Sequence, residues 1–263
     1  MVLRDRRVLV TGASSGIGWS TALELAAKGA RVAACARRAD RLEALCLQAG
    51  ERGLGGLLAV PCDVRDAAGV EGLRARVHQA WGGIDVVVNN AGRGAFGRFE
   101  DLDPEVAREV VETNLTGAIR VTRAFLPGML AQGGGHLVFI SSVLGELPAP
   151  RHAVYGATKF ALNGLAESLD FELGPRGVRI LLVEPGLVRT EFGQVSGSPA
   201  ERFAQVPHHS AQEVARAVVE ALEREERRCV PDALAGAAIA FRRHFPRTAR
   251  LLTPLVLRRL YGP

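Results

Sequence analysis

The sequence predicts an α/β fold, with a doubly wound parallel sheet of about seven strands and helices on both faces. Two observations lead to this prediction. Short β-branched runs alternate with helix-length segments, a pattern typical of parallel strands joined by crossover helices. The chain has 263 residues, of which 48% are hydrophobic and 23% charged, and it is long enough to bury a core and a ligand pocket.

The expected elements follow one another without an internal repeat or a linker. We expect strands at Arg7–Val10, Arg31–Ala36, Leu57–Pro61, Asp85–Asn89, His136–Ser141, Arg179–Glu184 and Arg227–Val230. We expect helices at Gly16–Lys28, Ala39–Ala49, Ala67–Trp81, Pro104–Leu130 and Val154–Leu173. The fourth helix should bend near Thr113–Gly117, where glycine and β-branched residues interrupt good helix formers.

Two segments depart from this alternation. Gly193–Pro207 is rich in Ser, Gly and Pro, which predicts a mobile loop or lid. We assign residues 1–231 to the main domain and residues 232–263 to a helical extension of it, with breaks at Pro246 and Pro254. The extension is apolar and Arg-rich, so peripheral contact with an anionic membrane is one interpretation. We favour the alternative, a solvated helical extension that packs over the pocket or a second subunit.

Composition and charge exclude several classes of protein. The net charge of +5 comes almost entirely from arginine, and no basic stripe alternates with aromatic residues, which argues against nucleic-acid binding. No apolar run reaches the length of a membrane span. The first apolar run enters a glycine turn and predicts a strand rather than a signal peptide. Four cysteines show neither metal-site spacing nor a redox pair, so we expect no metal and a cytoplasmic protein.

Tyr155 and Lys159 form a candidate proton-transfer pair. Residues four apart share one face of a helix, and these are one of two tyrosines and one of two lysines in the chain. A cation about 4 Å away, at an effective dielectric constant of about 20, contributes about 4 kcal/mol. Lowering a phenol pKa from about 10 to about 7 requires a similar free energy. We therefore expect Lys159 to lower the pKa of Tyr155.

A glycine-rich turn follows the first strand. Gly12, Gly16 and Gly18 let the backbone turn tightly and approach a pyrophosphate at the start of a helix. After the second strand, Ala36 stands where folds that select NAD place an acid, and Arg37 and Arg38 follow. Arg37 can pair with a 2′-phosphate, so we expect NADP, with NAD less favoured. The alternative is that both arginines only begin a solvated helix.

Together these residues resemble the short-chain dehydrogenase/reductase family, in its compact one-domain branch. The motifs occur in the family's order from Arg7 to Val230. The resemblance implies a Rossmann-type fold and an enzyme that uses a nicotinamide cofactor on CH–OH groups. With Arg37, the cofactor-binding residues that we expect are Gly12, Ser14, Ser15, Gly16, Ile17, Gly18, Asp63, Val64, Asn90, Ala91, Gly92, Tyr155, Lys159, Pro185, Gly186, Val188 and Thr190.

The resemblance also implies a catalytic set of Asn114, Ser142, Tyr155 and Lys159. In this set Tyr155 exchanges the proton and Ser142 polarises the carbonyl. Lys159 also holds the nicotinamide ribose, and Asn114 orders a water that passes protons to solvent. Two alternatives remain at this stage. In the first, Asn114 serves only to cap or bend its helix. In the second, Ser141 rather than Ser142 is the catalytic serine, although the thirteen-residue spacing to Tyr155 favours Ser142.

The expected function is NADP-dependent interconversion of a hydrophobic ketone or aldehyde and its alcohol. Mainly apolar segments, Arg93–Phe99, Val143–Arg151 and Leu187–Pro207, should line the substrate site, where arginines leave a carboxylate or thioester possible. His152 and Glu146 either line the mouth of that site or are solvated. A lyase or epimerase on the same fold and a non-catalytic NADP-binding sensor are the alternatives. We expect a homodimer or homotetramer, with a dimer contact through the helix that carries Tyr155.

Overall fold

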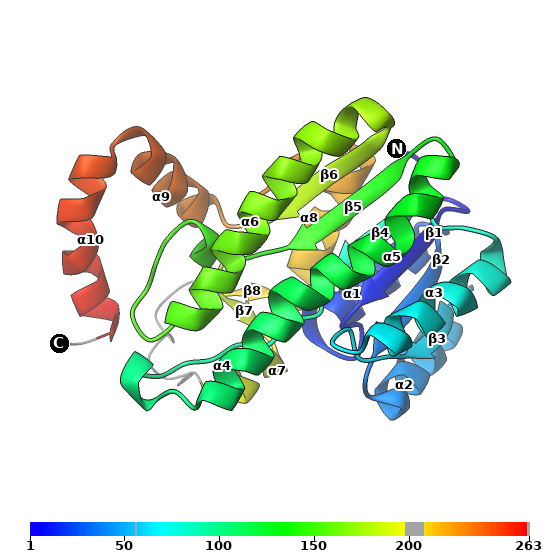
Figure 1. Cartoon of the computed structure of the whole chain (residues 1–263), viewed down its shortest axis with the longest axis horizontal. Helices are drawn as coiled ribbons and strands as arrows, with labels where there is room; N and C mark the ends of the chain where they lie inside the picture. The colour runs from blue at the N-terminus through cyan, green and yellow to red at the C-terminus, as the bar shows by residue number, and fades with distance from the viewer. Residues whose placement is uncertain (56, 198–207, 262–263) are drawn as a thin grey trace.

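A central parallel sheet organises the molecule, and the computed structural model describes residues 1–55, 57–197 and 208–261 (Figure 1). Seven strands lie in the order β3-β2-β1-β4-β5-β6-β9. They are β1 (Arg7–Thr11), β2 (Arg31–Ala36), β3 (Leu57–Pro61), β4 (Val86–Asn89), β5 (Gly135–Ile140), β6 (Val178–Val183) and β9 (Arg228–Cys229). The predicted sheet is confirmed, and the expected strand ends differ from the observed ones by at most about one residue.

Helices cover both faces of the sheet and enclose two cores (Figure 1). One core is covered by α1 (Gly16–Ala27), α2 (Ala39–Glu51) and α8 (Ala211–Glu223). The other is covered by α3 (Ala67–Trp81), α5 (Gly117–Ala131) and α6 (Ala153–Leu173). Successive residues of β1 point to opposite faces, so Val8 and Val10 enter the first core and Leu9 enters the second.

The strand order reverses at β1, which places a site at one edge of the sheet. β1 pairs with β2 on one side and with β4 on the other. In open α/β sheets, ligands bind outside the carboxyl ends of the strands at such a reversal. Thr11 and Asn89 end the two central strands at that edge.

The long fourth helix predicted from the sequence is interrupted where the bend was expected. α4 (Pro104–Val111) passes into a π-helical turn, η2 (Glu112–Thr116), before α5 begins at Gly117. Single π turns within helices often lie at functional sites, and this one carries Asn114. A Cβ atom at Gly117 would lie 2.7 Å from Val64 Cγ2, so glycine lets the turn approach the chain that follows β3.

The region after β6 contains elements that the sequence analysis missed. α7 (Glu191–Val195) and a small sheet of β7 (Val188–Arg189) and β8 (His209–Ser210) precede α8. The expected mobile loop Gly193–Pro207 begins in α7, and its residues 198–207 lie outside the described residues. α8 could have been predicted from the sequence, because Ser210 and Glu213 form a capping box before an apolar stripe.

The C-terminal extension forms two helices on the far side of α6 from β1, β2 and β3 (Figure 1). α9 (Ala233–His244) ends just before Pro246, and α10 (Pro246–Tyr261) begins with it, as expected. The break predicted at Pro254 is wrong, because α10 continues through that residue. A proline removes one helical hydrogen bond, here to the Arg250 carbonyl, and both residues are exposed, so water can satisfy that carbonyl.

Within the described part of the chain, none of the helices combines the length and the apolar character that crossing a membrane requires.

Candidate active site

The glycine turn after β1 is closely packed against the loop after β4. Gly12 has a φ of +67°, which favours glycine, and a Cβ atom there would lie 2.8 Å from Ala91 Cα. A Cβ atom at Gly18 would lie 2.5 Å from the Gly12 carbonyl oxygen. Both positions therefore require glycine. Ile17 packs against the first core and anchors the start of α1.

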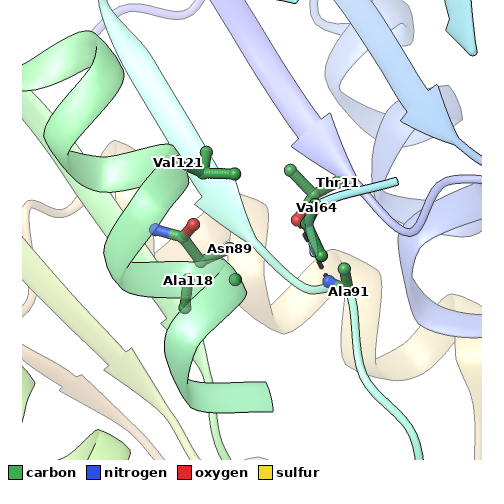
Figure 2. Close-up of a pocket in the computed structure, with 7 residues that line it drawn as sticks. Thr11, Val64, Asn89, Ala91, Ala118 and Val121 are labelled. Atoms are coloured by element: carbon green, nitrogen blue, oxygen red, sulfur yellow. Dashed lines mark hydrogen bonds between the residues drawn. The ribbon is translucent and has the colours of Figure 1, made fainter. Parts of the chain in front are cut away.

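Hydrogen bonds to Thr11 fix the loop after β4 at the sheet edge. The Thr11 hydroxyl accepts hydrogen bonds from the backbone amides of Asn90 and Ala91, each at 3.0 Å. The Asn90 side chain donates to the Thr11 carbonyl at 2.8 Å. Figure 2 shows Thr11, Val64, Asn89 and Ala91 around a small pocket between these strand ends and α5. The chain thus holds Asn90, Ala91 and Gly92 beside the glycine turn.

Arg38, rather than Arg37, lies on the glycine turn. The Arg38 guanidinium donates to the hydroxyl of Ser14 at 3.0 Å and to that of Ser15 at 2.9 Å. Arg37 instead lies near Asp63: burial raises the pKa of that carboxyl, but hydrogen bonds from Arg65 and the charge of Arg37 hold it below its ordinary value. The expected phosphate-binding residue was Arg37 alone, whereas it is Arg38, the second residue of the double arginine, that contacts the glycine turn.

The segment after β6 also reaches the glycine turn. A Cβ atom at Gly16 would lie 3.1 Å from Thr190 Cγ2, so Thr190 packs directly on the turn. The Pro185 carbonyl accepts a hydrogen bond from the Val143 amide at 3.0 Å. Gly186 allows close approach of Asp232, and Val188 lies in β7. The segment that we expect to hold the nicotinamide thus lies between the glycine turn and Ser142.

Ser142, Tyr155 and Lys159 come together at the carboxyl end of β5. Ser142 lies close enough to lower the pKa of the Tyr155 phenol, whereas the Ser141 hydroxyl points away and donates to Asn163 Oδ1 at 2.5 Å. Lys159 Nζ lies 5.6 Å from the centroid of the Tyr155 ring and donates to the Ile140 carbonyl at 2.9 Å. The geometry therefore favours Ser142 over Ser141 as the partner of Tyr155.

Burial dominates the ionisation of this pair. It raises the pKa of Tyr155 to about 12, against a smaller lowering by Ser142, and it lowers the pKa of Lys159 to about 8. We expected Lys159 to lower the pKa of the Tyr155 phenol toward about 7, and the interactions among the side chains of this chain show that expectation to be wrong. The phenol is desolvated, and Lys159 directs its ammonium to a carbonyl. Near neutral pH, the Tyr155 phenol is consequently protonated.

The lowered pKa of Lys159 predicts a pH dependence of stability. Between pH 8 and 10.5 the unfolded chain binds more protons at this lysine than the folded chain, so its contribution to stability rises with pH. Relative to a Lys159→Met variant, the wild type should gain about 3 kcal/mol of unfolding free energy from pH 7 to above pH 10. Urea unfolding of both proteins across this range measures the difference. A constant difference contradicts the prediction.

Asn114 joins the loop after β4 to α6. Its amide group donates to the Arg93 carbonyl at 2.9 Å and to the Thr158 hydroxyl at 3.0 Å. Its Oδ1 accepts from the Arg93 amide at 2.7 Å. These bonds hold Asn114 next to the α6 turn that carries Lys159, in the π turn rather than at a helix end.

Aromatic rings form a wall around the Tyr155 phenol. The ring centroids of Phe192 and Tyr155 are 5.6 Å apart, those of His152 and Tyr155 are 6.4 Å apart, and those of Phe96 and His152 are 5.1 Å apart. Burial lowers the pKa of His152 to about 4, so this imidazole is neutral near pH 7. His152 thus lies at the candidate substrate site, as one of the two sequence interpretations proposed.

A buried ion pair lies behind the candidate catalytic residues. Glu184 is 0% exposed at the end of β6. It accepts hydrogen bonds from Asn163 Nδ2 at 2.8 Å and from Arg228 Nε at 2.6 Å. Burial raises the pKa of Glu184, while Arg228 and Asn163 stabilise its charged form. Through Asn163, this pair supports Ser141 and hence the end of β5 next to Ser142.

Glu146 belongs to the same network and not to the substrate mouth. It pairs with Arg228 at 3.1 Å and also with Arg243 of α9. This network therefore ties the C-terminal extension to the turn that follows Ser142. Among the described residues, no group of His, Cys, Asp and Glu side chains is arranged to hold a metal ion.

Comparison with protein families gives a direct match. The family model described as short chain dehydrogenase matches residues 6–200. A putative ketoacyl reductase of Streptomyces coelicolor is 38% identical over 216 residues, which cover 81% of this chain and 81% of that protein. The bovine dehydrogenase/reductase SDR family member 7B is 34% identical over 72% of this chain, and the match spans only 60% of the bovine protein.

Solved structures share the architecture. A short-chain dehydrogenase/reductase from Burkholderia phymatum, in complex with NAD, superposes with a TM-score of 0.87 and covers 94% of this chain and 96% of its own, at 24% identity. An alcohol dehydrogenase from Thermococcus sibiricus, complexed with 5-hydroxy-NADP, has a TM-score of 0.77 and 33% identity, and covers 86% of this chain and 96% of its own.

Proposed function

Because the chain belongs to the short-chain dehydrogenase/reductase family, we propose that it reduces a hydrophobic ketone or aldehyde to its alcohol with NADPH. As a family member it is an oxidoreductase that acts on CH–OH groups with a nicotinamide cofactor. One observation carries the proposal for this chain: Tyr155, with Ser142 close enough to lower its pKa and with Lys159 beside its ring, lies next to other aromatic rings.

The residues at the sheet edge fit a phosphorylated dinucleotide. Gly12 and Gly18 leave a turn that a Cβ atom would fill, and the start of α1 supplies backbone amides for a pyrophosphate. Ser14, Ser15 and Arg38 offer donors for a 2′-phosphate, and Asp63 and Val64 lie at the end of β3 beyond them. When bound there, the reduced cofactor supplies the hydride.

The side chains of the chain perform the proton transfer. Ser142 donates a hydrogen bond that polarises the substrate carbonyl and orients it. Tyr155, protonated because burial raises its pKa, donates its proton to the carbonyl oxygen as negative charge develops there. Lys159 places positive charge near the resulting phenolate, and Asn114 holds the adjoining π turn against α6. We propose that protons return to Tyr155 from solvent along this lysine.

The aromatic wall supports an apolar substrate. Phe192 and His152 present uncharged rings next to Tyr155, and Phe96 packs against His152. A neutral imidazole carries no positive charge with which to bind the phosphate of a sugar phosphate. The relative named a ketoacyl reductase supports a carbonyl close to an acyl chain as one member of this substrate class.

Substitution of Arg38 tests the choice of cofactor. Hydrogen bonds to charged groups contribute about 1.5–3 kcal/mol, so Arg38→Gln should lower kcat/KM with NADPH by about 10- to 100-fold and leave kcat/KM with NADH nearly unchanged. The wild type should prefer NADPH. Arg74→Gln, which breaks an exposed pair in α3, is the matched control. Equal efficiencies of the wild type with NADPH and NADH would remove the NADP assignment.

The domain division, the oligomeric state and the cellular location of the protein are also proposals. We place residues 1–231 in the catalytic domain and 232–263 in an extension of it, supported by the network of Glu146 and Arg243. We propose a homo-oligomer in which α6 forms a contact, since Phe171 on α6 is 81% exposed. A cytoplasmic location is supported by the four free cysteine thiols.

A further inference from the structure

We propose that Glu191 competes with the 2′-phosphate of NADP for Arg38 and Arg41, and so sets how strongly the enzyme prefers NADP. The proposal rests on the proposed function, because it requires that the 2′-phosphate bind at Arg38. It also assigns a role in cofactor binding to Glu191 and Arg41, which are not among the site residues expected from the sequence.

An anion already lies between the two arginines. Glu191 Oε2 is 3.2 Å from Arg38 Nη1, and Glu191 Oε1 is 3.5 Å from Arg41 Nη2. The remaining donors of Arg38 reach the hydroxyls of Ser14 and Ser15 at 3.0–3.2 Å and 2.9 Å. Two guanidinium groups and two hydroxyls therefore converge, and the Glu191 carboxylate occupies the place of an anionic ligand.

The position of Glu191 in the fold explains how it reaches this place. It begins α7 directly after Thr190, which packs against Gly16 of the glycine turn. Arg41 lies in the first turn of α2, and Arg38 immediately precedes that helix. The carboxylate thus crosses from the segment after β6 to the segment after β2, which lie on either side of the turn.

The charge of each anion and the solvent exposure of the ion pairs determine which anion binds Arg38 and Arg41 more strongly. The side chains of Arg38, Arg41 and Glu191 are 44%, 48% and 44% exposed, so the ion pairs of the carboxylate are weak and open to exchange. A phosphate monoester carries a charge of about −1.5 to −2 near pH 7 and three acceptor oxygens, and it should displace a single carboxylate. NAD has a hydroxyl in place of this phosphate and leaves the Glu191 pairs intact.

Calorimetric titration of NADP⁺ and NAD⁺ into the purified full chain tests the proposal without turnover. Glu191→Gln removes the competing charge and should lower the Kd for NADP⁺ by about two- to fivefold, as expected for loss of an exposed ion pair. The Kd for NAD⁺ should stay within error. Glu220→Gln, which breaks an exposed pair with Arg224 on α8, is the matched control and should change neither Kd.

A double variant identifies the route of the effect. In an Arg38→Gln, Arg41→Gln background, the gain in NADP⁺ affinity from Glu191→Gln should vanish, since neither anion then has a guanidinium to compete for. An unchanged Kd for NADP⁺ in Glu191→Gln, a weaker one, or an equal shift for both cofactors would overturn the proposal. A wild type that binds NAD⁺ as tightly as NADP⁺ would instead overturn the NADP assignment itself.

Discussion

Replacing Tyr155 by phenylalanine should lower kcat by at least about 100-fold, and by up to about 10⁴-fold, while NADP⁺ still binds. This range is the usual contribution of a positioned general acid. The variant keeps the ring that packs against Phe192 and His152 and loses only the hydroxyl. Steady-state kinetics with NADPH and calorimetric binding of NADP⁺ measure the two effects separately.

Ser142→Ala and Ser141→Ala form the matched pair for this experiment. Ser142→Ala should lower kcat, because it removes the hydroxyl that polarises the substrate carbonyl, whereas Ser141→Ala removes a hydrogen bond to Asn163 and should act on stability. Turnover by Tyr155→Phe at the wild-type rate would contradict its assignment as the proton donor.

Replacing Arg228 by leucine should destabilise the protein by about 3–5 kcal/mol, because it leaves the buried charge of Glu184 without its partner. Glu184 is 0% exposed, and Arg228 Nε donates a hydrogen bond to its carboxylate at 2.6 Å. Removing one member of a buried pair costs far more than the pair itself contributes. Urea unfolding at pH 7 gives the change in free energy.

The neighbouring arginine provides the control. Arg227 is 81% exposed and pairs with Asp170 at 3.2 Å, so Arg227→Leu should cost no more than about 1 kcal/mol. Adding Glu184→Gln to Arg228→Leu should recover part of the loss, since it removes the unpaired charge. Equal destabilisation by the two arginine variants would contradict the buried-pair explanation.

Much of the fold was predictable because local patterns determined it. The strands around Val8 and Val32 are short apolar runs, and each is followed by a helix-length segment that contains no proline. The bend at Asn114 was predictable as well, since Gly117 and two threonines flank it. Its π-helical form was not, because that form depends on contacts such as the close approach of Gly117 to Val64.

The site was predictable as a set of residues but not as a set of pKa values. The spacing of Tyr155 and Lys159 placed them on one face, yet burial, which no spacing reports, reversed the expected shift of the phenol. The choice between Arg37 and Arg38 also depends on tertiary contacts, namely those with Ser14 and Ser15.

Contacts between segments that are far apart in the chain could not be predicted from the sequence. Cys35 of β2 interacts with Cys62, which follows β3, and this interaction raises the pKa of the former and lowers that of the latter. Glu191 reaches Arg38 across 153 positions of the chain. Neither contact follows a local motif, so only the folded chain shows them.

The most direct test of the account is oxidation of NADPH by the full chain with a panel of apolar ketones and aldehydes, with alcohol product measured in parallel. We predict that at least one apolar carbonyl compound consumes NADPH and yields one alcohol for each cofactor oxidised, and that Tyr155→Phe suppresses both signals. Conversion of a substrate without net NADPH oxidation would indicate a lyase or epimerase. Tight NADP⁺ binding without any turnover across the panel would instead indicate a cofactor sensor, and either result would contradict the proposed reductase.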